Sequence, residues 1–100
     1  MLVAMSRFEI KDPDRIDSVR AAFRNRPRLV EGAVGFIRLD VLQPHETPTE
    51  FWVMTYWTDQ AAFESWYGTH AFKTAHESLP EGIKLVQGAT RISFFDHIVS

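Results

Sequence analysis

A histidine within an apolar helical stripe is the feature of this sequence with the most distinctive chemistry. Beyond Thr69 the spacing predicts a short helical turn in which Phe72, His76 and Leu79 share one face. Neutral imidazole is the usual axial ligand where haem iron lies in an apolar pocket. A histidine on such a face can equally be a hydrogen-bonded residue of the core, so both interpretations of His76 stay open. Trp66, on the preceding helix, fits either a packed core or the wall of a pocket.

Two further polar side chains continue or interrupt apolar stripes. Ser6 is the polar member of an apolar strand face, where a serine commonly bonds to nearby backbone or fills a small space. Arg26 lies three residues beyond Phe23 on the stripe of the first helix. Its stem can cover the core while its charge reaches the rim at the negative helix end. Alternatively, Arg26 is a cation for an anionic ligand whose apolar part lies under Phe23.

Alternating strands and helices must position these residues. Asp12 with Pro13 predicts the start of the first helix, and Asp59 predicts the start of the second. Apolar alternation bounded by turn residues predicts the strands. The expected strands are residues 2–10, 36–43, 51–57 and part of 84–99 interrupted near 88, and the expected helices are residues 13–25 and a second one broken at 68–69. This β-α-β-β-α-β order predicts an α+β, ferredoxin-like fold with an antiparallel sheet and helices on one face.

The predicted sheet is apolar on both faces. In the third strand, Phe51, Val53 and Trp57 alternate with three other large residues, Trp52, Met54 and Tyr56. In the second strand, we expect Ile37, Leu39 and Val41 on one face and Phe36, Arg38, Asp40 and Leu42 on the other. A sheet with two apolar faces needs two coverings. Helices can cover one face and the sheet of a second copy the other, so we expect a homodimer.

Composition excludes several classes of function. One hundred residues make a single domain, 1–100, and the absence of cysteine excludes disulfides and thiolate chemistry. A formal net charge of −2 argues against a nucleic-acid partner, which needs a basic face. The sequence contains no glycine-rich phosphate loop and no G-x-S-x-G motif, and His70 and His76 are poorly spaced on a helix for a shared zinc. With neither a signal-peptide pattern nor a membrane segment, the expected location is cytoplasmic.

The segment TYWTDQAAFESWYGTHAFKTAHE carries a family pattern. It contains a T-x-W strand end, an A-F-x-x-W helix and an F-K-x-A-H turn, formed by Thr55 and Trp57, by Ala62, Phe63 and Trp66, and by Phe72, Lys73, Ala75 and His76. Phe23 before Arg26 and the segment E-G-A-V-G-F at 31–36 extend the similarity. In these residues the chain resembles the antibiotic biosynthesis monooxygenase (ABM) superfamily, and within it the IsdG-type haem-degrading monooxygenases.

This resemblance implies a dimeric α+β barrel with one pocket per subunit, between sheet and helices. It implies that His76 is the proximal iron ligand and that Trp66 presses on the porphyrin so that it ruffles. Ser6 aligns with the family's first-strand asparagine, which bonds near the distal oxygen. The further residues that the resemblance places against haem are Phe23, Arg26, Phe63 and Phe72, with Arg26 toward a propionate.

The function that the resemblance implies is oxidative opening of the porphyrin with release of iron. Haem is then both cofactor and substrate, and dioxygen and an external electron donor are required. Two other functions stay open. One is a cofactor-independent ABM-type monooxygenase that acts on a quinol or polyphenol, with His76, Ser6 or Arg7 bonding to the substrate. The other is a non-enzymatic dimer that binds haem.

Overall fold

The computed structural model of the chain describes residues 1–69, 80 and 82–100. The elements, in chain order, are β1 (Leu2–Glu9), the 3-10 turn η1 (Pro13–Arg15), α1 (Ile16–Arg24), the 3-10 turn η2 (Val30–Gly32), β2 (Phe36–Leu42), β3 (Glu50–Trp57), α2 (Gln60–Tyr67) and β4 (Arg91–Asp96). The predicted strand and helix order is confirmed within this part of the chain. The expected helical turn with Phe72 and His76 lies outside the described residues.

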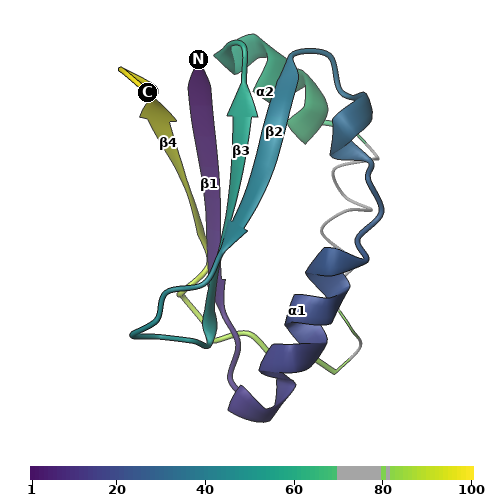
Figure 1. The fold of residues 1–100 in the computed structure, drawn as a ribbon, viewed down its shortest axis with the longest axis vertical. Coiled ribbons are helices and arrows are strands. Elements are labelled where there is room, and N and C mark those ends of the chain that lie inside the picture. The colour runs from purple at the N-terminus through teal and green to yellow at the C-terminus, as the bar shows by residue number, and fades with distance from the viewer. Residues whose placement is uncertain (70–79, 81) are drawn as a thin grey trace.

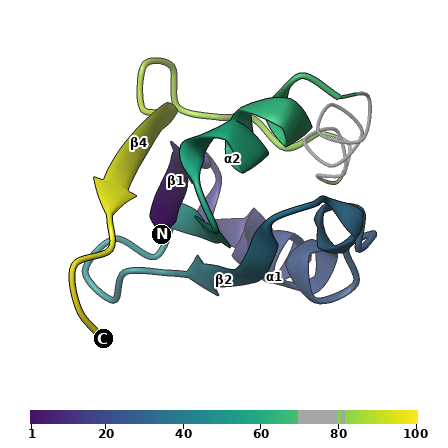
Figure 2. The same ribbon diagram turned by 90° about the horizontal axis from the view of Figure 1, so that it is seen from above.

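The four strands form one antiparallel sheet in the order β2-β3-β1-β4. Figure 1 shows the two central strands, β1 and β3, running side by side, with α1 to the right of the sheet. The view from above in Figure 2 shows α1 and α2 on the same side of the sheet. This arrangement is the ferredoxin-like α+β fold.

Short side-chain caps start the helical segments where the sequence predicts them. The Asp12 carboxylate accepts a hydrogen bond from the Asp14 amide at 2.9 Å, and the Asp59 carboxylate accepts one from the Ala62 amide at 2.8 Å. Each cap satisfies an amide that has no partner inside the helix. Helix α2 ends at Tyr67, and the amide of the next residue, Gly68, bonds back to the carbonyl of Glu64. These caps fix where α2 begins and ends over the sheet.

Two separate groups of buried residues hold the helices on the sheet. The first, the α2 cluster, joins one end of the sheet to α2 and η2 and contains Leu2, Ala4, Val30, Trp57, Phe63 and Trp66. The second, the α1 cluster, joins the other end of the sheet to α1 and contains Phe8, Ile10, Val19 and Phe51. Leu2, Ala4 and Phe8 alternate along one face of β1, and Ile10 follows just beyond its end, so both clusters lie on the same face.

The predicted alternation of the second strand is wrong at its start. The pairing of β2 with β3 shifts between Phe36 and Arg38, which leaves Ile37 as an extra, 47% exposed residue. Such a bulge adds one residue to the strand, so the alternation before it is out of phase with the alternation after it. Phe36 therefore faces the helices together with Leu39, and it packs edge-on against Trp57 with ring centroids 5.5 Å apart.

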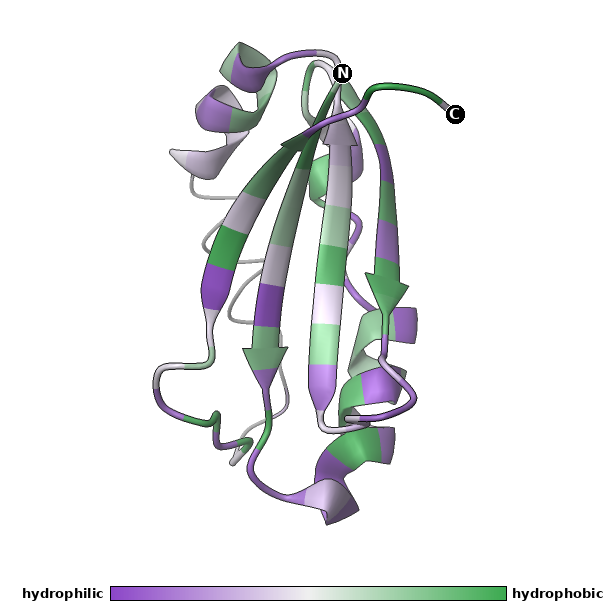
Figure 3. Cartoon of the chain, turned by 90° about the vertical axis from the view of Figure 1, so that its left-hand side faces the viewer, coloured by the Kyte–Doolittle hydropathy of each residue, from purple (hydrophilic) through white to green (hydrophobic). Residues whose placement is uncertain are grey.

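The opposite face of the sheet has no helix over it in the described part of the chain. Figure 3 views this face and shows hydrophobic and hydrophilic residues alternating along the strands. Trp52, Met54 and Tyr56 are half-buried there, as predicted, and Leu42 and Phe95 are each 47% exposed. Within residues 1–69, 80 and 82–100, no helix is both long and apolar enough to cross a membrane.

Candidate functional site

A row of four residues crosses the helix-covered face between the two clusters. Ser6 pairs with Val53 on one side and with Ile92 on the other, and Val53 pairs with Val41. We call Val41, Val53, Ser6 and Ile92 the central row. Ser6, Val53 and Val41 are half-buried, and Ile92 is 37% exposed. The middle of this face is thus more accessible than the clusters at either end, and its floor carries the Ser6 hydroxyl among aliphatic side chains.

Aromatic side chains of α2 bound the central row on one side. Phe63 and Trp66 point from successive turns of α2 onto Trp57, with ring centroids 5.7 Å apart in both pairs. Phe63 also meets Phe94 of β4 edge-on at 5.3 Å. Phe63 is 6% exposed and Trp66 is 9% exposed, so both rings are part of the core as well as of the wall.

An apolar hollow of about 320 Å³ opens between α2 and β4. Its lining consists of Phe63, Glu64, Tyr67, Ile92 and Phe94. Ile92 belongs to the central row, so the hollow lies beside the strand position of Ser6. Its volume is at the lower end of the range for small-molecule sites, and its mainly aromatic lining is typical of them.

Phe23 lies at the other end of the central row. Its ring centroid is 6.1 Å from that of Phe8 and 6.0 Å from that of Phe51. These rings belong to or pack against the α1 cluster. Phe23 therefore stands on the same face as Ser6 but on the opposite side of the row from Trp66.

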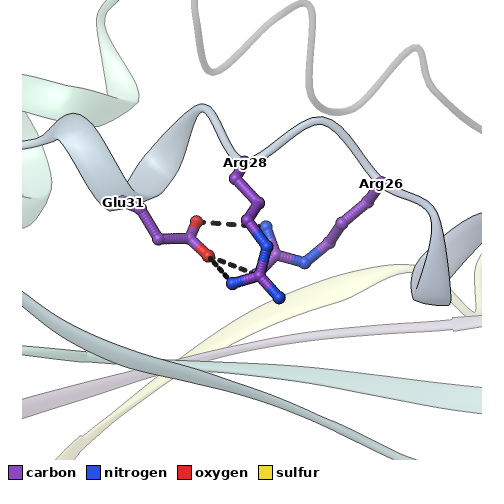
Figure 4. Close-up of polar contacts among 3 residues, drawn as sticks. All are labelled: Arg26, Arg28 and Glu31. Carbon is purple, nitrogen blue, oxygen red and sulfur yellow. Dashed lines mark hydrogen bonds and ion pairs between the residues drawn. The ribbon is translucent and has the colours of Figure 1, made fainter.

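Arg26 is paired with an acidic side chain of the chain itself. Its guanidinium donates two hydrogen bonds to the Glu31 carboxylate, at 2.7 and 3.2 Å, and Arg28 donates a third at 3.2 Å. Figure 4 shows Arg26 and Arg28, from the connection between α1 and η2, converging on Glu31 of η2. The hydrogen bonds from Arg26, and its charge, hold the pKa of the Glu31 carboxyl below its ordinary value of 4.5. Glu31 is therefore ionised at neutral pH.

The structure thus brings together Ser6, Phe63 and Trp66 around the central row, with Phe23 beyond its far side. Arg26 follows Phe23 in the connection that leads to η2. Phe72 and His76 lie outside the described residues. Sequence reasoning missed Ile92 and Phe94 as lining residues, because the pairing of β4 with β1, not the alternation itself, decides which face they join. It also missed Glu31, for which the irregular connection offers no periodic signal.

The donor set of the site is poor in groups that bind a bare metal ion. In the part of the chain that the structure describes, no three His, Asp or Glu side chains lie together in such a way. Apolar and aromatic walls around one hydroxyl instead suit a flat, largely apolar organic ligand. A haem would meet this requirement through its ring, while its iron would need a ligand from outside the described residues.

Comparison with known proteins finds the same fold in a heme-degrader and in a cofactor-independent oxygenase. The heme-degrader MhuD from Mycobacterium tuberculosis, solved with two hemes bound in its active site, superposes with a TM-score of 0.79 at 20% identity, over 100% of this chain and 98% of MhuD. A mutant of MhuD with two manganese protoporphyrin IX molecules per active site gives 0.80 at 18% identity, over 100% and 97%. SnoaB, a cofactor-independent oxygenase from Streptomyces nogalater, gives 0.74 at 15% identity, over 99% and 94%.

These identities establish a common fold, and the family follows from the sequence itself. The family profile described as antibiotic biosynthesis monooxygenase matches residues 1–78, which span β1 to α2 and the segment beyond it. Because the match covers most of the chain, this protein belongs to the antibiotic biosynthesis monooxygenase family.

Proposed function

We propose that this protein is a haem-binding monooxygenase that opens the porphyrin ring and releases iron. The observation that supports the proposal most is the position of Ser6, the one hydroxyl of an aliphatic central row, between the aromatic rings of α2 and those beneath α1. The likeness to MhuD, a heme-degrader with the same fold, adds to it.

In this proposal each residue has a separate task. Trp66 and Phe63 form an apolar wall, and close packing on Trp57 keeps Trp66 rigid enough to press on a ring. Ser6 presents a hydrogen-bond donor to oxygen. Phe23 and Phe72 complete the apolar lining, and Arg26 lies toward the propionates. His76 is the iron ligand.

Bound haem would supply the iron at which dioxygen reacts with electrons from an external donor, and its ring would be the substrate. The chain's contribution is to orient that ring and exclude water. The half-exposed aromatic and aliphatic residues on the other sheet face fit a homodimer, in which a second sheet would cover Trp52, Met54 and Tyr56.

A second candidate is a cofactor-independent oxygenase acting on a quinol or polyphenol. The hollow of about 320 Å³ favours it, because this volume fits one small aromatic molecule better than a porphyrin. SnoaB has the same fold and is a cofactor-independent oxygenase. In this case Ser6 or His76 would bond to the substrate directly, whereas Arg7 pairs with Trp52 on the other face of the sheet and bonds to Glu50 at 3.3 Å. A dimer that binds haem without degrading it is the non-enzymatic alternative.

Hemin titration of the wild type against His76→Ala tests the proposal. We expect saturable binding of one hemin per subunit with the Soret spectrum of a histidine-ligated iron, and loss of that spectrum in His76→Ala. His45→Ala is the matched control, because His45 is an exposed histidine in the turn between β2 and β3. Absence of binding at micromolar hemin would refute the haem proposal.

A parallel assay without hemin distinguishes the cofactor-independent oxygenase from the haem-dependent function. Dioxygen consumption is followed with a panel of quinols and polyphenols. Turnover in the absence of hemin would favour the cofactor-independent function, whether or not His76→Ala slows it. Hemin binding with no ring opening under reductant, oxygen and catalase would leave the non-enzymatic haem-binding dimer.

A further inference from the structure

The Glu31 carboxylate occupies both ends of the Arg26 guanidinium. The Arg26 nitrogens Nη1 and Nη2 lie 3.2 and 2.7 Å from Glu31 Oε1 and Oε2. This two-bond geometry is the one that arginine offers to any carboxylate, including one on a ligand. Arg26 therefore already holds an anion that belongs to the chain.

The Arg26–Glu31 pair is partly shielded from water, so Glu31 can compete with a ligand carboxylate for Arg26. The Arg26 side chain is 18% exposed and that of Glu31 is 30% exposed, so water screens this pair less than a fully exposed one. Arg28 is 78% exposed and gives Glu31 one further hydrogen bond. Two cations thus face one anion, and the group of three keeps a net positive charge (Figure 4).

Arg26, Arg28 and Glu31 belong to the segment that leads from the α1 cluster to the α2 cluster of the candidate site. Arg26 follows Phe23, which packs against the α1 cluster, and Glu31 follows Val30, which belongs to the α2 cluster. The connection therefore passes from the α1 cluster to the α2 cluster, and η2 packs against β2, the strand that carries Val41 of the row. The apolar hollow lies at the row's other edge, beside Ile92. An aromatic ligand lying on the row would have its charged groups at the connection.

We propose that Glu31 determines ligand specificity by competing with the carboxylates of an aromatic ligand for Arg26. The proposal rests on the proposed function in that haem is the expected carboxylate-bearing ligand. A ligand carboxylate that reaches Arg26 must displace Glu31, so the exchange of one ion pair for another adds little net affinity. Arg28, whose guanidinium is largely in water and makes a single hydrogen bond to Glu31, is the more accessible cation for ligands that do not displace Glu31.

The proposal predicts a difference between a charged and an uncharged form of one ligand. Glu31→Gln should raise the affinity for hemin by about fivefold, the range of a partly exposed ion pair, and leave the affinity for hemin dimethyl ester unchanged. Glu46→Gln is the control for net charge, because Glu46 is exposed in the β2–β3 turn. It should leave both affinities unchanged.

The double variant Glu31→Gln/Arg26→Gln shows whether the gain in hemin affinity depends on Arg26. In the wild-type background, Arg26→Gln should change hemin affinity less than twofold, because Arg26 is already occupied by Glu31. In the Glu31→Gln background it should abolish the gain. A gain that persists without Arg26, or a gain of the same size for the ester, would overturn the proposal.

A second probe keeps the test independent of haem. The same five proteins, which are the wild type, Glu31→Gln, Glu46→Gln, Arg26→Gln and the double variant, are titrated with 8-anilinonaphthalene-1-sulfonate, an anionic aromatic dye, and with uncharged N-phenyl-1-naphthylamine. If hemin does not bind, the proposed function fails, while a gain for the anionic dye alone in Glu31→Gln still supports the competition. If hemin binds through His76 but Glu31→Gln behaves like Glu46→Gln with every probe, the role of Glu31 is refuted and the haem proposal stands.

Discussion

The indole of Trp66 packs on the indole of Trp57, with ring centroids 5.7 Å apart and the planes inclined by 35°. Trp57 is completely buried, and its indole N–H donates a hydrogen bond to the Thr55 hydroxyl at 2.8 Å. The Thr55 hydroxyl in turn donates to the carbonyl of Ala4 at 3.4 Å. Trp66 is therefore held by a partner that is itself fixed to both central strands, so the same ring contributes to stability and to the site.

Replacement of Trp66 should separate these two contributions. Trp66→Ala removes a buried aromatic ring and should lower the free energy of unfolding by about 3–5 kcal/mol. Trp66→Phe keeps an aromatic ring against Trp57 and should cost about 1–2 kcal/mol. Urea unfolding followed by circular dichroism measures both values.

The role of Trp66 in ring opening is tested with Trp66→Phe alone, because this variant should stay folded. We expect it to bind hemin and to open the ring more slowly than the wild type, because a smaller ring presses less on the porphyrin. Wild-type turnover in folded Trp66→Phe would contradict a distorting role for Trp66.

Gly35 should be intolerant of any side chain. It has φ = +83°, and a Cβ there would lie 2.5 Å from the Cβ of Ala62 and 2.7 Å from the Thr58 hydroxyl. Gly35→Ala combines a strained backbone with a clash against α2, and should lower the free energy of unfolding by at least about 2 kcal/mol. Thermal unfolding measures the change.

Gly32→Ala is the matched control for that substitution. Gly32 is in the same connection, its φ is not positive, and a Cβ there would meet nothing within 4 Å. We expect a change within about 0.5 kcal/mol. Equal effects at positions 32 and 35 would show that α2 does not approach the chain at Gly35 as closely as the structure has it.

Ser6 should matter for chemistry more than for stability. Its hydroxyl has no hydrogen-bond partner among the described residues, so Ser6→Ala should change the free energy of unfolding by no more than about 0.5 kcal/mol. Loss of one donor to oxygen should slow ring opening by roughly fivefold. Ser6→Asn, which introduces the asparagine that the resemblance to IsdG-type enzymes implies at this position, should speed it. Ser65→Ala, at an exposed position of α2, is the control, and equal turnover in all four proteins would exclude Ser6 from the reaction.

The Arg26–Glu31 pair should give stability a defined pH dependence. The pKa of Glu31 in the folded chain lies below its ordinary value of 4.5, chiefly because Arg26 donates hydrogen bonds to the carboxylate, with Arg28 adding its charge. A lowered folded pKa stabilises the folded state fully above the unfolded pKa, and this stabilisation is lost as pH falls through the folded pKa. The difference in stability between wild type and Glu31→Gln should be constant near neutral pH and shrink below about pH 4.5.

Thermal unfolding of both proteins from about pH 7 to about pH 3 provides that comparison. High salt should reduce the difference at neutral pH, because the pair is partly exposed. A difference that grows as the pH falls would contradict the pairing of Glu31 with the two arginines.

The fold could be predicted from sequence because its signals are local. Asp12 and Asp59 mark helix starts, and the alternation around Phe51 identifies β3 and both of its faces. The orientation of Phe36 could not be predicted, because the bulge at Ile37 depends on pairing with β3 and leaves no mark in the residues of β2 alone.

The site was predictable only in part, for the same reason. Periodicity marks Trp66 and Ser6 as unusual on their own elements, but the pairing of Ser6 with Ile92 depends on strand order. Arg26 was predictable as a rim cation, while its bond to Glu31 crosses an irregular connection, where side-chain contacts follow no fixed spacing. The assignment of His76 as iron ligand stays a prediction from sequence.

Iron release from the hemin-loaded protein tests the central claim most directly. The loaded wild type is mixed with ascorbate in air, with catalase present to remove free peroxide, and ferrous iron is trapped by a colorimetric chelator while the Soret band is followed. The account predicts loss of the Soret band together with release of one iron per hemin, and neither in argon nor with His76→Ala. An intact Soret band with no released iron, in protein that binds hemin through His76, would contradict it.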